Sequence, residues 1–430
     1  MKAYVMAGGF GTRLLEITKG EVPKPLAKIA GVPLLERAIL TLKNHGVTEL
    51  FISVSHMAEK IVNYFNNGEK FGVKIEYIFE ETPLGSGGAL YYLKDKVKGD
   101  FIVCSSDTVF EIDVKKMLSF HKKRKAVATL FTHPNTHPYD SDIVLTDRFS
   151  RVTGFMLKNS ERNGYYKNNV NAGFAILSAK SLDIIKECKK MNFEHDFIIS
   201  LIENGEKVCA YKSSEYIKDA GTPERFYKVE KEILSGLVED RCYKNKQKAI
   251  FIDRDGTLNV YKGFINSQEQ IELEKGVCAG VKKINESVYL AIVISNQPVI
   301  ARGEATFLEV ERTFDKIETL LGKEKAYLDG VYYCPHHPDK GFKGEVKRLK
   351  KDCSCRKPKI GLIEKAVKDF NLDLSSCFMI GDSEVDVLTG KNANIPQIQL
   401  QSGYKDTQKE KPTYLAYNFL DAANFCLEKR

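Results

Sequence analysis

The chain has 430 residues, of which 43% are hydrophobic and 28% charged, a balance that excludes extended disorder, a collagen-like rod and a coiled coil. Because single hydrophobic cores stop growing at roughly 250–300 residues, this length predicts two or three domains. The 65 Lys and Arg residues outnumber the 57 Asp and Glu residues, and this excess suits anionic small molecules as well as nucleic acid.

The sequence also bears on where the protein works. It contains no apolar run of the roughly 18 residues needed to cross a bilayer, and its N-terminus lacks the apolar core of a signal peptide. We therefore expect a cytoplasmic protein without a membrane span. In that compartment the ten cysteines should be reduced, and three of them lie with histidines in one short segment, which favours metal binding there.

Two short apolar stretches, 2–6 and 248–252, predict the first strands of two α/β domains. Polar residues follow each stretch, and open α/β sheets bind ligands at the carboxyl ends of their strands. The predicted fold class is therefore α/β, with two doubly wound domains. A charged segment without a sustained apolar period separates them. We predict a first domain at 1–235, a linker at 236–247 and a second domain at 248–430.

The loop after the first predicted strand suits a triphosphate. Gly8, Gly9 and Gly11 allow backbone N–H groups to approach phosphate oxygens closely. Arg13 and Lys24 add positive charge, and the prolines on either side of Lys24 keep it in an extended segment. Three glycines alone are equally compatible with a plain tight turn.

Two segments together, Gly8 to Leu14 and Pro23 to Leu26, resemble the signature of sugar-1-phosphate nucleotidyltransferases. Further segments follow in the order of that family, including Leu84 to Ala89, which resembles the part that approaches the nucleotide base. The resemblance implies a Rossmann-like domain in which Arg13 and Lys24 are catalytic. The implied nucleotide-binding residues are Gly8, Gly9, Gly11, Thr12, Arg13, Lys24, Gly85 and Asp107.

The same resemblance implies a magnesium site and a sugar phosphate site. Asp107 follows an apolar stretch and Asp219 lies in a second carboxylate segment, so these two residues are the implied Mg²⁺ ligands. Taken singly, each is more often a solvated residue or a helix cap. Asn171 and Gly173 match the sugar-contacting strand of the family. Lys158 matches its phosphate clamp, although a plain surface lysine is the alternative, and Leu157 replaces an acidic partner.

In the implied transfer reaction, an oxygen of the sugar phosphate attacks the α-phosphorus of a nucleoside triphosphate and releases pyrophosphate. Both reactants are anionic, so the protein has to neutralise charge and align the two groups. The positive charges of Arg13 and Lys24, beside Mg²⁺, serve that purpose.

The second predicted domain begins with Asp253 and Asp255 at the end of a strand. This spacing allows one carboxylate to act as nucleophile and the other as acid and base. Asp253 to Leu258 resembles the first motif of the haloacid-dehalogenase (HAD) phosphatase superfamily, and the remaining motifs follow in order. The resemblance assigns phosphoryl binding to Ser295 and Lys357, Mg²⁺ binding to Asp253, Asp255 and Asp382, and an orienting role to Asp386. Pro298 and Ser383 depart from its closest members.

A cysteine-rich loop distinguishes this phosphatase. Cys334, His336, Cys353 and Cys355 offer three thiolates and one imidazole, which suit a tetrahedral structural Zn²⁺. A metal-free cysteine cluster is the alternative. His336 is preferred to His337 because the loop resembles that of heptose-bisphosphate and histidinol-phosphate phosphatases. To Ser295 and Lys357, the resemblance adds three substrate-binding residues, namely Asn296, Arg302 and Arg356.

The fusion of the two halves indicates the overall function. Removing the 7-phosphate of a heptose 1,7-bisphosphate yields the heptose 1-phosphate that the other half would couple to a nucleotide. The chain resembles, over nearly its whole length, the bifunctional enzymes of GDP-heptose biosynthesis for surface polysaccharides. The resemblance implies GTP and heptose phosphates as substrates, and the sequence allows a homo-oligomer.

Three alternatives remain open from the sequence. Mannose 1-phosphate or histidinol phosphate could replace the heptose substrates. A binding protein with decayed catalytic halves is disfavoured because Asp107, Asp253 and Asp382 are present. Nucleic acid is not an expected partner, since the basic residues are dispersed and form no stripe with interleaved aromatic residues.

Overall fold

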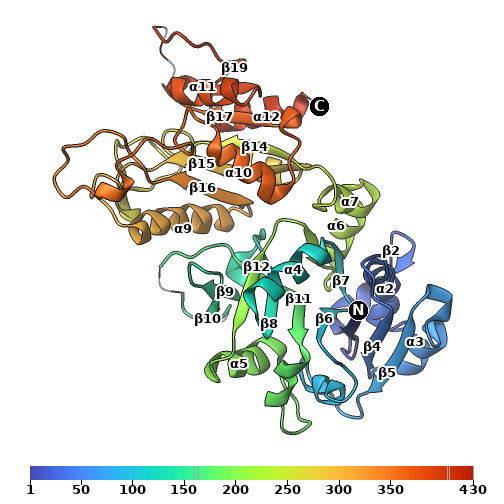
Figure 1. The fold of residues 1–430 in the computed structure, drawn as a ribbon. Helices are drawn as coiled ribbons and strands as arrows, with labels where there is room; N and C mark the ends of the chain where they lie inside the picture. Colours follow the sequence, from blue (N-terminus) through green and yellow to red (C-terminus); the bar gives the residue numbers. More distant parts are fainter. Residues whose placement is uncertain (159, 163, 404, 406, 430) are drawn as a thin grey trace. The chain divides into compact units, whose positions relative to one another are not determined.

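The computed structural model describes residues 1–158, 160–162, 164–403, 405 and 407–429 (Figure 1). The chain divides into two compact units that exchange at several points of the sequence. The first unit comprises Met1–His133, Val144–Met156 and Asn171–Cys242, and the second comprises Pro134–Ile143, Leu157–Val170 and Tyr243–Arg430. The last exchange lies within the predicted linker 236–247, which also contains the short helix α7.

The first unit is built on a nine-stranded mixed sheet with the order β10-β9-β11-β6-β1-β4-β5, while β8 joins β11 to β12. β1 is parallel to β4 and β6, and β11 is antiparallel to β6. The strands are β1 (Lys2–Met6), β4 (Glu49–Val54), β5 (Lys74–Phe79), β6 (Asp100–Ser105), β8 (Ala128–His133), β9 (Ile143–Thr146), β10 (Val152–Met156), β11 (Val170–Ser178) and β12 (Val208–Lys212).

Two small ribbons and seven α-helices complete this part of the chain. β7 (Thr108–Glu111) pairs with β13 (Tyr216–Asp219), and β2 (Lys28–Ile29) pairs with β3 (Val32–Pro33). The helices are α1 (Leu15–Thr18), α2 (Leu34–Asn44), α3 (Ala58–Phe65), α4 (Val114–Arg124), α5 (Ile199–Glu203), α6 (Pro223–Leu234) and α7 (Leu237–Asp240).

Alternation along β1 explains why this sheet is covered on both faces. Ala3 and Val5 join one buried cluster, whereas Tyr4 between them joins another. Successive residues of a strand point to opposite faces, so a continuous apolar strand requires two hydrophobic layers. Polar groups can then gather only beyond the strand ends, where β1 leads into the glycine-rich loop.

The second unit has a six-stranded, wholly parallel sheet with the order β16-β15-β14-β17-β18-β19. After β14, the chain adds β15 and β16 on one side of it, and then β17, β18 and β19 on the other side. Such a reversal creates a ligand-binding crevice at the carboxyl ends of the two central strands. The strands are β14 (Lys248–Ile252), β15 (Tyr289–Asn296), β16 (Gly330–Cys334), β17 (Phe378–Gly381), β18 (Gln397–Leu400) and β19 (Tyr414–Ala416).

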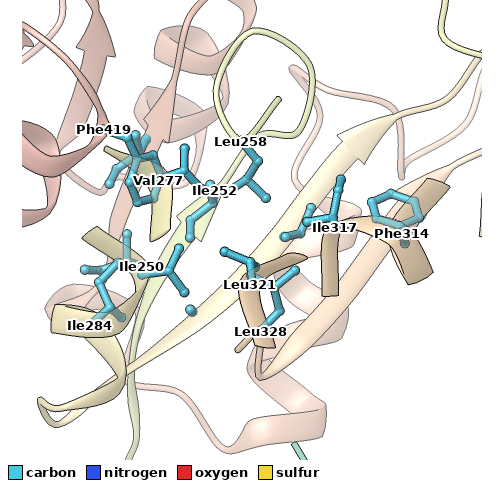
Figure 2. Close-up of a cluster of buried hydrophobic side chains, with 14 of the residues drawn as sticks. Ile250, Ile252, Leu258, Val277, Ile284, Phe314, Ile317, Leu321, Leu328 and Phe419 are labelled. Atoms are coloured by element: carbon cyan, nitrogen blue, oxygen red, sulfur yellow. The ribbon is translucent and has the colours of Figure 1, made fainter. Parts of the chain in front are cut away.

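Hydrophobic clusters cover both faces of this second sheet. Figure 2 shows Ile250 and Ile252 with residues such as Ile317 and Phe419, and Phe251 packs into a separate cluster on the other face. α9 begins with a capping box in which Thr306 and Glu309 bond each other's backbone N–H groups. The helices are α8 (Val277–Asn285), α9 (Phe307–Lys323), α10 (Gly361–Phe370), α11 (Glu384–Asn392) and α12 (Phe419–Glu428). Within the described residues, every helix is too short or too polar to span a bilayer.

Candidate active sites and metal centre

The glycine-rich loop follows β1 and is shaped by two close approaches. Gly11 has a φ of 66°, and a Cβ atom there would lie 2.8 Å from the Cβ of Lys24. A Cβ atom on Gly8 would lie 2.6 Å from Oε1 of Glu80. Glycine is therefore favoured at position 11 by both conformation and space, whereas a side chain at position 8 would have to displace the carboxylate of Glu80. Gly9 has open space around it and Arg13 is exposed, so this side of the loop is accessible to a ligand.

Lys24, Asp107 and Asp219 meet at the carboxyl edge of this sheet. The Lys24 ammonium group donates to Oδ2 of Asp107, and the hydroxyl of Ser105 donates to Oδ1. A Cβ atom on Gly221 would lie 2.6 Å from Oδ1 of Asp219 and 3.0 Å from both Oδ2 of Asp107 and Nζ of Lys24. The structure thus brings together one predicted phosphate ligand and both predicted Mg²⁺ ligands.

The pKa values of the two carboxyl groups in this cluster are shifted in opposite directions. Burial raises the pKa of Asp107, but the charge and hydrogen bond of Lys24 outweigh burial and hold the pKa below its usual value. Burial and the neighbouring Asp107 raise the pKa of Asp219, although Arg225 donates to Asp219 at 2.5 Å. Two adjacent carboxylates, one in the turn after β6 and one on β13, fit a hard divalent cation such as Mg²⁺.

The predicted base-contacting segment is held by its own glycines. Gly85 has a φ of 72°, and a Cβ atom there would lie 2.6 Å from the carbonyl oxygen of Met191. The N–H of Gly87 donates to that same oxygen at 2.8 Å. The small residues of this segment therefore accommodate the backbone around Met191. The segment begins beside Glu80, because the N–H of Leu84 donates to Oε2 of Glu80 at 3.0 Å.

Sequence reasoning missed Glu80, the buried carboxylate shared by the glycine-rich loop and the base-contacting segment. Among the described contacts, no ion pair joins it to a cation. The sequence did offer one sign of this residue, because Glu80 directly follows the apolar end of β5. Polar residues that follow buried strands lie at the edge of the sheet where ligands bind. An unpaired carboxylate at this place is suited to receive donors from a ligand.

The predicted sugar-binding residues belong to different units of the chain. Asn171 and Gly173 both lie on β11, where Nδ2 of Asn171 donates to Glu194 at 2.9 Å and Gly173 has a φ of 69°. Lys158 is exposed and lies in a segment that groups with the second unit. Its backbone N–H donates to Oδ1 of Asp142 at 2.8 Å.

The second active site is a cluster of carboxylates around a buried lysine. Nζ of Lys357 lies 2.7 Å from Oδ1 of Asp253 and 2.6 Å from Oδ1 of Asp386. Oxygen atoms of Asp253, Asp382 and Asp386 lie within 4.8 Å of one another. β14 delivers Asp253, β17 leads to Asp382, and α11 presents Asp386 one turn later.

Charge is poorly balanced in this cluster. Burial raises the pKa of Asp253 to about 7, despite the attraction of Lys357. Burial, together with repulsion from Asp253 and Asp386, raises the pKa of Asp382 to about 8. The pKa of Lys357 is raised because its two carboxylate partners outweigh the opposing effect of burial. A divalent cation fits here, since it would allow the three carboxyl groups to ionise together.

Asp255 is held apart from that cluster by partners of its own. The fully buried Arg254 donates to both of its carboxylate oxygens, at 3.0 and 2.7 Å, and Gln297 donates to Oδ2 at 3.1 Å. Arg254 is itself fixed by Thr313, its partner at 2.9 Å. The structure therefore orients Asp255 without bringing its side chain into the group formed by Asp253, Asp382 and Asp386. Sequence reasoning missed Arg254 and Gln297 as supports.

Two residues predicted to bind substrate also organise the site. The side-chain amide of Asn296 accepts from the N–H of Lys357 at 2.9 Å and donates to its carbonyl oxygen at 3.1 Å. Asn296 thus fixes the backbone that carries the buried ammonium group. Ser295 accepts from Gln297 at 2.9 Å. Ser383 donates to Oδ2 of Asp386 at 2.6 Å and caps α11.

The two predicted arginine ligands lie in different surroundings. The guanidinium group of Arg302 lies 4.1 Å from the ring centre of Phe264 and 4.3 Å from that of Phe342, and it pairs with Glu304 at 2.7 Å. Arg356 donates to the carbonyl oxygen of His336 at 3.2 Å, which ties it to the cysteine-rich loop.

Cys334, His336, Cys353 and Cys355 converge as a tight group. The sulfur atoms lie 3.2 to 3.5 Å apart, and Nδ1 of His336 lies 3.3 Å from the sulfur of Cys355 and 3.7 Å from that of Cys334. A tetrahedral Zn²⁺ with bonds of about 2.3 Å has ligand separations of about 3.7 Å, so the set fits zinc with every position taken by protein. His337 points elsewhere, with its ring against Phe342.

Comparison with known proteins identifies both parts. Residues 2–236 match the nucleotidyl transferase family, and residues 354–422 match the HAD-hydrolase-like family. The chain is 36% identical over 181 residues to the D-glycero-beta-D-manno-heptose-1,7-bisphosphate 7-phosphatase of Pasteurella multocida, an alignment that covers 41% of this chain and 94% of the relative. It is 34% identical over 175 residues, 40% of this chain and 93% of the relative, to the D-glycero-alpha-D-manno-heptose-1,7-bisphosphate 7-phosphatase of Photorhabdus laumondii.

A third relative matches the first part. The mannose-1-phosphate guanylyltransferase of Mycobacterium tuberculosis is 29% identical over 237 residues, which cover 55% of this chain and 65% of the relative, just under two thirds of its length. The chain therefore belongs to the nucleotidyl transferase family, and its second part belongs to the heptose-1,7-bisphosphate 7-phosphatases. The predicted fold class and the predicted fusion of a nucleotidyltransferase with a HAD phosphatase are confirmed.

Proposed function

We propose that this protein removes the 7-phosphate of D-glycero-α-D-manno-heptose 1,7-bisphosphate and then transfers GMP from GTP to the heptose 1-phosphate, releasing pyrophosphate. The proposal is supported by two clusters of carboxylates and a lysine in one chain, one around Lys24 and one around Lys357. The relatives of the two parts are named as a heptose-bisphosphate phosphatase and a guanylyltransferase. In one chain, two such activities would act one after the other.

In the phosphatase reaction, Asp253 is the proposed nucleophile. Its carboxylate oxygen bonds to the 7-phosphorus, and the bond from phosphorus to the sugar oxygen breaks. Asp255, oriented by Arg254, gives a proton to that sugar oxygen and then takes one from the water that hydrolyses the aspartyl phosphate. Lys357 and Ser295 stabilise the phosphoryl oxygens. Mg²⁺, held by Asp253, Asp382 and Asp386, would offset the negative charge of the site when bound.

In the transfer reaction, the protein positions two anions. The backbone N–H groups of the glycine-rich loop and the charges of Arg13 and Lys24 stabilise the triphosphate, so that the sugar phosphate oxygen can approach the α-phosphorus in line. Asp107 and Asp219 would hold Mg²⁺, which neutralises charge on the phosphates when bound. Thr12 and Gly85 complete the proposed nucleotide contacts, and Asn171, Gly173 and Lys158 are the proposed sugar phosphate contacts.

The carboxylate of Glu80 supports GTP as the donor. Guanine presents two adjacent donors, N1–H and the 2-amino group, which match the acceptor-only edge of a carboxylate. The other common bases place an acceptor beside each donor on the corresponding edge. Since each oxygen of Glu80 has more than one lone pair, the bond from Leu84 leaves acceptor capacity for a base.

Zinc is the proposed structural ion of the second part. Cys334, His336, Cys353 and Cys355 would hold it, and the next residues along the chain are Arg356 and Lys357. A rigid loop at this place would keep both cations oriented toward phosphate groups. Arg302 is the proposed contact to the second phosphate of the substrate. We further propose that the enzyme works in the cytoplasm, with 1–235 and 248–430 as catalytic domains, and that its product serves the synthesis of lipopolysaccharide or capsule.

The proposal is tested by mass spectrometry of the products. The purified protein is incubated with the α-heptose 1,7-bisphosphate, Mg²⁺ and one nucleoside triphosphate per reaction. We expect inorganic phosphate in every reaction and GDP-heptose only with GTP. Parallel reactions with the β anomer, mannose 1-phosphate and histidinol phosphate test the alternative substrates. If the α-heptose compound is not converted, the heptose assignment is refuted.

A further inference from the structure

The segment after β18 (residues 401–403 and 407–410) lies against the turn that carries Asp382. β18 is parallel to β17, the strand that ends directly before Asp382, so both strands end at the same edge of the sheet. A Cβ atom on Gly403 would collide with the carbonyl oxygen of Asp382 and lie 2.9 Å from its Cβ. On the carboxylate side, a Cβ atom on Gly256 would lie 2.7 Å from Cγ of Asp382. Two other segments of the chain therefore border the backbone and the carboxylate of Asp382.

A buried glutamine of β18 bonds the backbone of Asp382. Gln399 has no exposed surface, and its Nε2 donates to the carbonyl oxygen of Asp382 at 2.9 Å. This carbonyl group belongs to the peptide that joins Asp382 to Ser383, the cap of α11. Because a buried carbonyl oxygen without a donor is costly, the bond favours one orientation of this peptide.

A second glutamine fixes the orientation of Gln399. Nε2 of Gln399 also donates to Oε1 of Gln408 at 3.1 Å, and Nε2 of Gln408 donates back to Oε1 of Gln399 at 2.7 Å. Nε2 of Gln408 donates in addition to the carbonyl oxygen of Glu410 at 2.7 Å. Both hydrogens of each amide thus have an acceptor, and a network that is satisfied in this way specifies one arrangement of its members.

The same segment also bonds α11, the helix that carries Asp386. The N–H groups of Lys409 and Glu410 donate to Oε1 of Glu384, in the first turn of this helix, at 2.8 and 2.9 Å. The carboxylate of Glu410 pairs with Lys391, in the last turn, at 2.6 Å. These contacts are independent of the pair of glutamines, so the segment holds the helix as well as the turn before it.

We propose that Gln399 and Gln408 are positioning residues for the phosphatase reaction, because they set the backbone at Asp382 and, through it, the affinity of the site for a divalent cation. Their amides bond the backbone and each other, and they act through Asp382. The inference rests on the proposed phosphatase activity, in which Asp382 holds Mg²⁺. It implies that losing the pair weakens cation binding more than it slows the reaction of the loaded site.

Full-length Gln399→Leu tests this inference, since leucine has a similar size but cannot bond the carbonyl oxygen of Asp382. We expect the Mg²⁺ concentration for half-maximal phosphate release to rise roughly tenfold, the lower end of the effect of residues that support metal ligands. At saturating Mg²⁺, the phosphatase kcat should stay within about twofold of wild type. Calorimetry should show the same shift in the Mg²⁺ concentration that raises the Tm of the second unit.

Gln408→Leu is a second variant, at a partly exposed residue outside the sheet. It removes the partner that orients Gln399 but keeps the donor to Asp382. We therefore expect a smaller rise in the Mg²⁺ requirement, of about threefold, which corresponds to the loss of one ordinary hydrogen bond. This variant tests the inference even where Gln399→Leu fails to fold.

Gln397→Leu is the matched control on the same strand. Gln397 is 8% exposed, and its Oε1 accepts from the hydroxyl of Thr413 at 3.1 Å. The substitution also removes a hydrogen-bonded glutamine from β18, and it should lower the Tm. It should leave the Mg²⁺ concentration for half-maximal phosphate release unchanged.

An unchanged Mg²⁺ requirement in Gln399→Leu and Gln408→Leu would overturn the positioning role, as would an equal rise in Gln397→Leu. A lower kcat at saturating Mg²⁺ without a change in the Mg²⁺ requirement would overturn it as well. A wild-type protein that releases no phosphate from the bisphosphate would instead refute the underlying activity, and this result is recognised before any substitution is made.

Discussion

The two active sites differ in the balance between their carboxylates and the positively charged side chains beside them. In each, polar residues beyond parallel strands gather around one lysine, Lys24 in the first unit and Lys357 in the second. In the first, two carboxylates are opposed by Lys24 and by Arg225, and the pKa of Asp107 is lowered. In the second, three carboxylates share one ammonium group, and the pKa values of Asp253 and Asp382 are raised to about 7 and about 8.

The difference reflects what each site has to bind. A site for a nucleoside triphosphate receives several negative charges with its ligand, so its own residues are close to balance. The phosphatase site keeps a nucleophilic carboxylate among other carboxylates, and its excess negative charge has to be offset by a cation. A site with more carboxylates than positively charged partners therefore needs a bound cation more than a site in which the two are nearly equal.

The largest effect is expected from removing the nucleophile. Asp253→Asn keeps the size of the side chain but eliminates covalent catalysis, so phosphate release from the bisphosphate should fall by about 10⁴-fold or more. Phosphate release from the bisphosphate and nucleotide transfer from GTP to heptose 1-phosphate are measured on the same preparation. Transfer should be unchanged, and a matching loss of transfer would mean that the two reactions share one site.

A smaller effect is expected from the lysine of the other cluster. Lys24→Met removes a preorganised charge from the triphosphate site and should lower the transferase kcat/KM by about 10²- to 10³-fold. Steady-state assays of both activities measure the change. The phosphatase activity is the internal control, and a loss of less than threefold would contradict the proposed role of Lys24.

Base selection should change by a still smaller factor. Glu80→Gln replaces one acceptor by a donor and should reduce the preference for GTP over UTP by roughly 5- to 150-fold, the value of one bidentate base contact. Competition between the two triphosphates gives this ratio directly. Glu81→Gln, at the exposed neighbouring residue, is the matched control and should leave the ratio unchanged. Equal ratios in the two variants would remove Glu80 from base recognition.

The smallest effect concerns stability against pH. Because the pKa values of Asp253 and Asp382 exceed the value of about 3.9 expected in the unfolded chain, the folded protein binds more protons than the unfolded one between about pH 4 and 8. Stability without a divalent cation should therefore fall as pH rises through this range, and Tm should decrease with it.

Calorimetry with and without Mg²⁺ measures this dependence. Mg²⁺ should weaken the pH dependence of stability for the second unit. The first unit should show a weaker pH dependence because the pKa values of Asp107 and Asp219 are shifted in opposite directions. A metal-free protein whose second unit becomes more stable from pH 5 to pH 8 would contradict the charge assignment.

The sequence predicted those features that depend on local spacing. Asp253, Asp382 and the four residues of the cysteine-rich loop each follow an apolar strand or form a close pair, and the structure brings each set together. Residues that act through distant partners were not predictable in this way. Arg254 lies between two predicted catalytic residues, but only the fold shows that it is buried and bonded to Asp255.

Two further features required the structure. Asn296 was predicted as a substrate ligand from its motif, but only the structure shows that its amide bonds the backbone of Lys357, a partner 61 residues away. The grouping of 157–170 with the second unit involves bonds to Thr319 and Glu318 of α9, partners 153 and 150 residues away in sequence. Periodicity and motif spacing carry no information about such long-range packing.

The most direct test of the account follows both products over time from the α-heptose 1,7-bisphosphate, GTP and Mg²⁺, with the wild type and with Asp107→Asn. We expect the wild type to form heptose 1-phosphate and then GDP-heptose, whereas Asp107→Asn should release phosphate at the wild-type rate and accumulate heptose 1-phosphate. Nucleotide transfer to the bisphosphate before phosphate release, or loss of phosphate release in Asp107→Asn, would contradict two separate sites that act in sequence.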